Sequence, residues 1–293
     1  MANIQKNISL ADKTSYKIGG PARIYAEPRT EEEIIELYGY AADHGLPVFI
    51  LGMGSNLLIS DAGIDGLVIN LSAHFSGIAW DGRTARVQSG YLLDDLAAAA
   101  ASRGFAGIAE LSGIPGTVGG AVVMNAGAFD VDVAKTLRSV HVIRVGTNLT
   151  FEDIPASELA LGYRTSIFKG GTDVILSAVF EFEAADAEQI MSIRSRILTK
   201  RQEKQPIDYP NCGSVFKRPP GNYAGTLIES CGLKGFTIGG AMVSEKHANF
   251  IINTGGATAE DVRGVIRHVQ KTVYEKSGLL LEPEVIFVGA FND

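Results

Sequence analysis

The chain has 293 residues, of which 46% are hydrophobic and 20% charged, a balance typical of a soluble globular protein that buries a sizeable core. Its formal net charge of −7 argues against general nucleic-acid binding, which requires a basic surface. The N-terminal stretch MANIQKNISLADKTSYKIGG has no apolar signal-peptide core, and no apolar run is long enough to span a membrane. Cys212 and Cys231 belong to no CxxC or Cys/His cluster, so we expect a cytoplasmic protein with two free thiols and no metal site.

Helices and strands alternate along the first two thirds of the chain. Thr30 and Glu33 form a capping-box pattern ahead of apolar residues at helical spacing, and Gly45 and Pro47 end that helix. An alanine-rich helix is predicted over 92–102 and a charged helix over about 186–204. Short apolar or alternating runs predict strands at 48–51, 66–71, 83–90, 140–145 and 173–183.

The stretch 204–210, KQPIDYP, breaks all periodicity and predicts a domain boundary. After it we expect a short helix near 223–230 and a helix that opens at Thr258 with Asp261 at its N3 position. Strands are predicted at 250–253 and 279–288. The pattern indicates an α+β or mixed α/β protein of two or three domains.

Two apolar segments each run into a glycine cluster, GMGSN at 52–56 and GIPGTVGGA at 113–121. Glycine lets successive amide N–H groups point into one concavity and lets a ligand approach the backbone, so such clusters bind pyrophosphate without a lysine. Neither cluster matches the Rossmann fingerprint or a Walker loop. The competing interpretation is a tight turn between strands, and two long clusters in one chain leave the two interpretations evenly matched.

Polar candidates for chemistry are spread over four further stretches. Ser214 follows a glycine, but Phe216 stands where a GxSxG elbow needs its second glycine. Glu282 and Glu284 lie at i and i+2 of a predicted strand and share one face, where neighbouring carboxylates can create a proton donor. Alone, each stretch favours the simpler interpretation, an ordinary turn serine for Ser214 and a solvated acidic pair for Glu282 and Glu284.

The remaining candidates are mainly basic. Arg164, next to Tyr163, could form a two-pronged contact with a substrate carboxylate. Lys204, Lys217 and Arg218 flank the predicted boundary and could meet phosphate, while His247 directly precedes a strand. Each has a simpler interpretation as a solvated surface residue.

Seven stretches in order resemble the UDP-N-acetylenolpyruvoylglucosamine reductases, the MurB flavoenzymes of peptidoglycan precursor synthesis. The resemblance covers essentially the whole chain, and the absence of a tyrosine-bearing insertion between 182 and 205 is similar to the shorter-loop branch of that family. The stretches are TSYKIGGPA at 14–22, LGMGSNLLISDAGIDG at 51–66, SGIPGTVGGAVVMNAGAF at 112–129, GYRTSIF at 162–168, CGSVFKRP at 212–219, GGAMVSEKHANFIIN at 239–253 and LEPEV at 281–285.

This resemblance implies a two-part FAD-binding unit of the vanillyl-alcohol-oxidase-like type and a C-terminal α/β substrate-binding domain. Residues 1–73, joined by a C-terminal strand at 284–293, would form the first FAD-binding subdomain, 74–205 the second, and 206–283 the substrate domain. The two glycine segments contain no histidine or cysteine, so the FAD is expected to be noncovalent. The implied cofactor-binding residues are Gly52, Met53, Gly54, Ser55, Asn56, Leu57, Gly113, Ile114, Pro115, Thr117, Gly119, Gly120, Ala121 and Asn125.

The resemblance also implies the reaction: NADPH reduces the flavin, which then reduces UDP-N-acetylglucosamine enolpyruvate to UDP-N-acetylmuramate. Arg164 is matched to the residue that stabilises the enolate-like state, Glu284 to its partner, and Ser214 to the proton donor. The residues matched to the UDP and nicotinamide-nucleotide region are Tyr163, Lys204, Lys217, Arg218 and His247.

Two other classes remain open at this point. An FAD-dependent oxidase of the same fold acting on an alcohol would need neither Ser214 nor Glu284, and a noncatalytic nucleotide-binding protein would bind no flavin. A monomer with no nucleic-acid or membrane partner is expected.

Overall fold

The computed structural model describes residues 3–291, which fall into two compact units. The first unit comprises the chain up to residue 4, 26–53 and 69–200, and the second comprises 5–25, 54–68 and the chain from 201 onward. The expected subdomain at 1–73 and strand at 284–293 each include two residues that lie outside the described part. The division into three domains stays a prediction, and each unit is described by itself.

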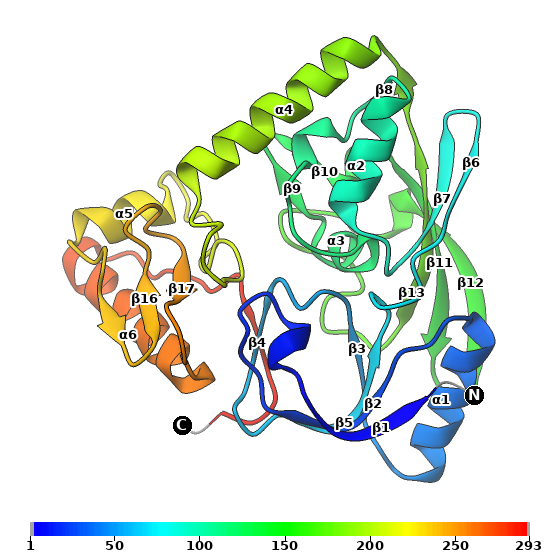
Figure 1. Ribbon diagram of the computed structural model, residues 1–293, viewed down its shortest axis with the longest axis horizontal. Helices are drawn as coiled ribbons and strands as arrows, with labels where there is room; N and C mark the ends of the chain where they lie inside the picture. The colour runs from blue at the N-terminus through cyan, green and yellow to red at the C-terminus, as the bar shows by residue number, and fades with distance from the viewer. Residues whose placement is uncertain (1–2, 292–293) are drawn as a thin grey trace. The chain divides into compact units, whose positions relative to one another are not determined.

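A five-stranded antiparallel sheet forms the centre of the first unit (Figure 1). One of its faces packs against the helices α2 and α3 and buries a core that includes Val87, Val140 and Phe180. The opposite face carries the alternate side chains of the same strands. In spatial order the strands are β12 (Leu149–Pro155), β11 (Leu137–Val145), β13 (Val174–Glu181), β7 (Thr84–Gln88) and β6 (Ile78–Asp81).

Local signals in the sequence account for the helices of this unit. Thr30 caps α1 (Glu31–Asp43), but the Glu33 carboxylate accepts from the N–H of Arg29 rather than that of Thr30. Asp186 accepts from the N–H of Gln189 at the start of α4. The other helices and the remaining strands are α2 (Leu93–Ser102), α3 (Val118–Met124), α4 (Ala187–Lys204), β3 (Val48–Leu51), β8 (Phe105–Ala106), β9 (Gly127–Ala128), β10 (Val131–Asp132) and β14 (Glu183–Ala184).

The second unit is built around the long helix α6 (Ala259–Ser277), whose apolar stripe faces a core with Phe216, Val243 and Ile251. Its N-terminus has the predicted capping box, and the Asp61 carboxylate also accepts from two N–H groups of its first turn. The other elements are β1 (Ile4–Ser9), β2 (Pro21–Ala26), β4 (Leu57–Ile59), β5 (Ile64–Asn70), α5 (Ala224–Ser230), β15 (Thr237–Ile238), β16 (Ala241–Val243), β17 (Ile251–Asn253) and β18 (Ile286–Val288).

Three short sheets complete this unit. β2 lies between β1 and β5, the strands β15, β16 and β17 pair in that order, and β18 pairs in parallel with β4. The final strand is therefore much shorter than the predicted 279–288. Residues 279–285 are not a strand, because Pro283 makes only an isolated bridge to Phe216.

The other predicted elements are present with small shifts at their ends, but one helix and several strands were not predicted. The strands missed include β1, β2, β6, β12 and β16. The glycine-rich stretch at 113–121 contains the start of α3, which sequence reasoning treated as loop throughout. No helix among the described residues has both the length and the apolar character needed to cross a membrane.

Candidate flavin-binding and catalytic site

Gly52 of the first glycine cluster contacts Thr117 of the second cluster, and both residues lie in the first unit. A Cβ atom placed on Gly52 would lie 2.5 Å from the Thr117 hydroxyl oxygen, well inside contact distance. Only glycine therefore allows the end of β3 to approach the N-cap of α3 this closely. The contact supports the interpretation of the clusters as two halves of one cradle rather than as unrelated turns.

The first cluster presents backbone donors. In the part of the chain that the structure describes, the N–H groups of Gly52, Met53, Gly54 and Asn56 donate no hydrogen bond. Gly54 has a φ of +60°, and a Cβ there would lie 2.9 Å from the carbonyl oxygen of Lys13. A run of unpaired amides at a tight glycine bend is the arrangement that binds an anionic phosphate group.

The second cluster uses most of its amides internally. Gly113 donates to the Asp94 carboxylate at 2.8 Å, and Val118 and Gly119 donate to the carbonyls of Tyr91 and Ser89, each at 2.8 Å. The N–H groups of Gly120 and Ala121 bond to the hydroxyl and carbonyl oxygens of Thr117. Within residues 3–291, the amides of this cluster without a protein acceptor are those of Gly116 and Thr117.

Asp94 is a supporting residue that sequence reasoning missed. Its carboxylate holds the Gly113 amide and also forms a two-pronged ion pair with Arg194 of α4, with N–O distances of 2.5 and 3.1 Å. The only sequence signal was an acidic residue in the first turn of the predicted helix 92–102, which ordinarily indicates a helix-end charge.

Asn125, an expected cofactor contact, has its polar atoms occupied by the protein. It ends α3 with a left-handed φ of +40° and is 2% exposed. Its Nδ2 donates to the Asp132 carboxylate at 3.0 Å and to the Gly162 carbonyl at 3.1 Å, while its Oδ1 accepts from the N–H of Ala134 at 3.0 Å. The side chain therefore holds the loop that precedes Arg164.

Arg164 stands on a constrained loop. Its φ is +55°, which is uncommon for a residue with a side chain, and its guanidinium donates to the Gly127 carbonyl at 3.0 Å. Ser166 donates to the Val123 carbonyl at 2.8 Å, so the loop is attached to the C-terminal end of α3 on both sides of Arg164. The guanidinium also lies 5.0 Å from the ring of Tyr163, which is 57% exposed.

Ser214 and Glu284 come together in the second unit. The N–H of Glu284 donates to the carbonyl of Val215 at 2.7 Å, and its own carbonyl accepts from the Asn56 amide at 3.1 Å. The Ser214 hydroxyl makes no hydrogen bond within the described chain. The pKa of the neighbouring Cys212 thiol is raised to about 12, mainly by burial and in part by the negative charge of Glu284, whose carboxylate is therefore close to this turn.

The acidic pair of LEPEV is not a pair in the structure. The Glu282 carboxylate binds the Lys217 ammonium, and its carbonyl accepts from the Lys217 N–H at 2.9 Å. Since residues 282–284 are not in a strand, the expected shared face is wrong. Glu284 is left as the carboxylate beside the Ser214 turn.

The other expected nucleotide contacts occupy varied settings. The Arg218 guanidinium lies 4.1 Å from the Tyr223 ring centre, and Lys204 is the last residue of α4. His247 is half-buried, its Nδ1 accepts from the Asn249 N–H at 3.2 Å, and burial lowers its pKa below the ordinary 6.5. Their roles toward a ligand stay predictions.

Two family models match the chain. An FAD binding domain model matches residues 22–147, and a model of the UDP-N-acetylenolpyruvoylglucosamine reductase C-terminal domain matches residues 205–288. The first model spans both glycine clusters. Together they define an FAD-binding oxidoreductase with a dedicated C-terminal domain.

Known proteins make the class specific. The chain is 43% identical to the UDP-N-acetylenolpyruvoylglucosamine reductase of Clostridium perfringens (strain SM101 / Type A), over 96% of this chain and 91% of that protein. It is 44% identical to the enzyme of the same name from Caldanaerobacter subterraneus subsp. tengcongensis, over 94% and 90%. The crystal structure of the Thermus caldophilus reductase (MurB) superposes with a TM-score of 0.85, at 34% identity and over 99% of this chain and 100% of that one.

The chain belongs to the UDP-N-acetylenolpyruvoylglucosamine reductase (MurB) family. It is an FAD-dependent oxidoreductase, a UDP-N-acetylmuramate dehydrogenase of peptidoglycan precursor synthesis. The family and the use of FAD expected from the seven motifs are confirmed.

Proposed function

We propose that NADPH is the reductant, that the FAD is noncovalent, and that Arg164, Ser214 and Glu284 carry out the chemistry on the enolpyruvyl ether of a UDP-sugar. The observation that carries the cofactor part is the Gly52–Thr117 contact, because it joins two segments with unpaired amides into one cradle. Bound FAD would supply hydride acceptance and donation.

The FAD pyrophosphate would be held by backbone rather than by side-chain charge. The donors would be the N–H groups of Gly52, Met53, Gly116 and Thr117, which all lie in the first unit and have no acceptor within the described chain. No histidine or cysteine occurs in either cluster, which supports noncovalent attachment.

Arg164 would bind the carboxylate of the enolpyruvyl group. Hydride addition leaves negative charge on the adjacent carbon and on this carboxylate, and a guanidinium offers two parallel N–H donors that match a carboxylate. The attachment of its loop to α3 through Asn125 and Ser166 would hold those donors in place before charge develops, which is where electrostatic stabilisation is most effective.

Ser214 would deliver the proton to the carbanionic carbon, with Glu284 as the partner that polarises the substrate carboxylate. A serine is a weak acid and can serve only against a strongly basic intermediate. A hydroxyl with no hydrogen bond in the described chain is free to rotate toward a substrate. Contacts to the UDP and nicotinamide nucleotides would come from Tyr163, Lys204, Lys217, Arg218 and His247.

The test separates the two half-reactions of Ser214→Ala by stopped-flow absorbance at the flavin band. Flavin reduction by NADPH needs no proton from Ser214 and should run at the wild-type rate, whereas reoxidation by the enolpyruvyl substrate should slow roughly 10²–10⁴-fold. Ser230→Ala is the matched control, since that exposed hydroxyl bonds only to the Leu227 carbonyl. Equal slowing of both halves, or of neither, would contradict the assignment.

A further inference from the structure

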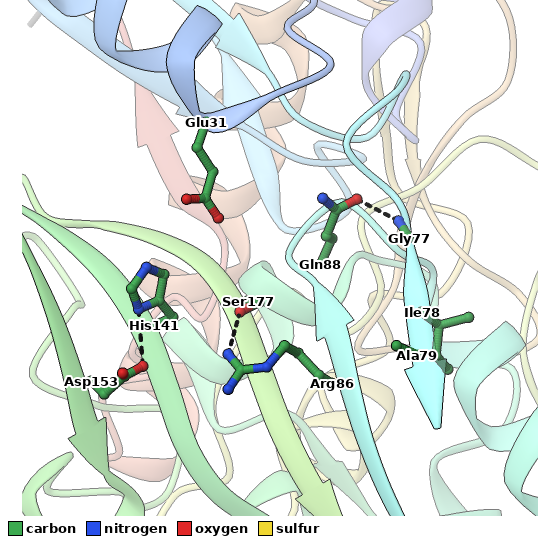
Figure 2. Close-up of a pocket in the computed structure, with 9 residues that line it drawn as sticks. All are labelled: Glu31, Gly77, Ile78, Ala79, Arg86, Gln88, His141, Asp153 and Ser177. Carbon is green, nitrogen blue, oxygen red and sulfur yellow. Dashed lines mark hydrogen bonds and ion pairs between the residues drawn. The ribbon is translucent and has the colours of Figure 1, made fainter. Parts of the chain in front are cut away.

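The outer face of the five-stranded sheet carries a row of polar side chains that the reductase reaction does not use. Asp153 on β12 stands opposite His141 on β11, His141 stands opposite Ser177 on β13, and Ser177 stands opposite Gln88 on β7. The row is the floor of a pocket of about 480 Å³ (Figure 2). The helices α2 and α3 pack on the other face of the sheet, so the pocket is separate from the glycine cradle.

One side of this pocket offers hydrogen-bond donors and a positive charge. The Arg86 guanidinium lies 3.4 Å from the Ser177 hydroxyl, and within residues 3–291 it forms no ion pair. Gln88 accepts from the Gly77 N–H at 2.6 Å through Oε1, which orients its amide and leaves its NH₂ group to donate. A guanidinium next to a hydroxyl and an amide suits a carboxylate.

The other side offers acceptors and a negative charge. Figure 2 shows the Glu31 carboxylate, from the first turn of α1, directed into the space above His141 and Ser177. Glu31 has no ion pair or hydrogen bond of its side chain in the described chain, and it does not reach Arg86. His141 Nδ1 lies 2.9 Å from the Asp153 carboxylate, which can only accept, so the ring donates through Nδ1, and in that tautomer Nε2 is an acceptor. These groups suit an ammonium.

We propose that this pocket binds a small zwitterion of the α-amino-acid class. Its carboxylate lies on Arg86, Ser177 and Gln88, its ammonium lies on Glu31 and His141, and its side chain contacts the apolar wall at 78–79. An opposed guanidinium and carboxylate that do not pair with each other complement the two charges of such a ligand.

The order Asp153–His141–Ser177 does not make this a hydrolytic triad. Among the described residues, Ser177 has no hydrogen bond to the imidazole, and its oxygen accepts from Arg86 instead. A nucleophile of this kind needs its hydroxyl proton aligned on the base. The constellation is therefore built for binding.

The test is calorimetric or saturation-transfer NMR titration of the holoenzyme with glycine, L-alanine and L-leucine. We expect saturable binding near about 1 mM, with acetate and methylammonium each at least roughly tenfold weaker because each retains one charged end. Arg86→Gln and Glu31→Gln should each weaken L-alanine binding roughly tenfold or more. The matched controls are Arg83→Gln and Glu32→Gln, on the same hairpin and helix but outside the pocket, and should bind as the wild type does.

A pocket-filling pair guards against a folding artefact. Ala79 is exposed and lines the pocket, so Ala79→Trp should abolish binding, while Asp81→Trp, two residues along the same face of β6, should not. All variants should keep the wild-type reductase rate. The proposal is overturned by the absence of saturable binding of any amino acid at about 50 mM, by acetate or methylammonium binding as tightly as L-alanine, or by wild-type affinity in Arg86→Gln.

Discussion

Asn125→Ala should destabilise the first unit and slow turnover together, because one buried side chain holds three backbone or side-chain partners. The change removes the acceptor of the Ala134 N–H and the donor to the Gly162 carbonyl, and each buried group left unsatisfied costs about 1–3 kcal/mol. Alanine also adopts the left-handed φ of +40° less readily than asparagine, at about 1 kcal/mol. The sum is at least about 3 kcal/mol, equivalent to a fall in Tm of roughly 6–12 °C for a protein of this size.

The assay uses the single tryptophan. Trp80 lies in the first unit, with its ring 5.6 Å from that of Phe105 and 5.7 Å from that of Phe182, so its fluorescence follows unfolding of that unit. Asn125→Gly separates the two contributions, since glycine restores the backbone freedom but not the hydrogen bonds and should recover only about 1 kcal/mol. Asn148→Ala, in the exposed turn between β11 and β12, is the control.

Turnover provides the second readout. If Asn125 positions the loop of Arg164, kcat should fall while flavin remains bound. Two results would refute the reasoning from hydrogen bonds. One is a free energy of unfolding of Asn125→Ala within about 0.5 kcal/mol of the wild-type value, and the other is an Asn125→Gly variant with wild-type stability.

Three further outcomes follow from individual contacts. Gly52→Ala should be purified with little FAD, measured as the ratio of flavin to protein absorbance, because its Cβ would lie 2.5 Å from the Thr117 hydroxyl oxygen. The matched control is Gly120→Ala, whose Cβ would lie 3.6 Å from that oxygen. Equal flavin content in the two variants would contradict the cradle. Arg164→Lys keeps the charge but loses the two-pronged donor, so turnover should fall by roughly 10²-fold or more at unchanged FAD content, and near-normal turnover would remove Arg164 from the chemistry. Burial lowers the pKa of His247 in the folded protein, so as the pH falls the unfolded chain takes up this proton before the folded chain does. The contribution of this group to the free energy of unfolding is therefore complete above pH 6.5 and decreases as the pH falls from there toward the lower folded pKa. Urea titrations at several pH values should show this decrease in the wild type and not in His247→Gln.

Periodicity and caps predicted most of the helices and the longer buried strands because the causes of these elements are local. The capping box of Thr258 and Asp261 and the apolar stripe that follows it depend on residues within a few positions of one another. The strand predicted at 279–285 is absent because the local apolar pattern does not report nonlocal contacts. Pro283 has no N–H to donate to a sheet, and the Glu282 carboxylate binds Lys217. The pairing of 215–217 with 282–284 joins segments almost 70 residues apart, which no local pattern reveals.

The glycines of the second cluster illustrate how far composition alone can indicate function. The sequence of 113–121 indicated either an anion-binding backbone or a tight turn, and the structure separates the reasons for individual glycines. Gly119 is a packing residue, because its Cβ would lie 2.8 Å from that of Ser89 and its amide is bonded to the Ser89 carbonyl. Gly116 has a φ of +139° and, within the described chain, an amide with no acceptor, so its glycine serves the backbone geometry of the cradle itself. A glycine-rich segment can thus combine close helix packing with anion binding. Whether the amide N–H of a given glycine has an acceptor in the protein distinguishes the two roles, and the number of glycines does not.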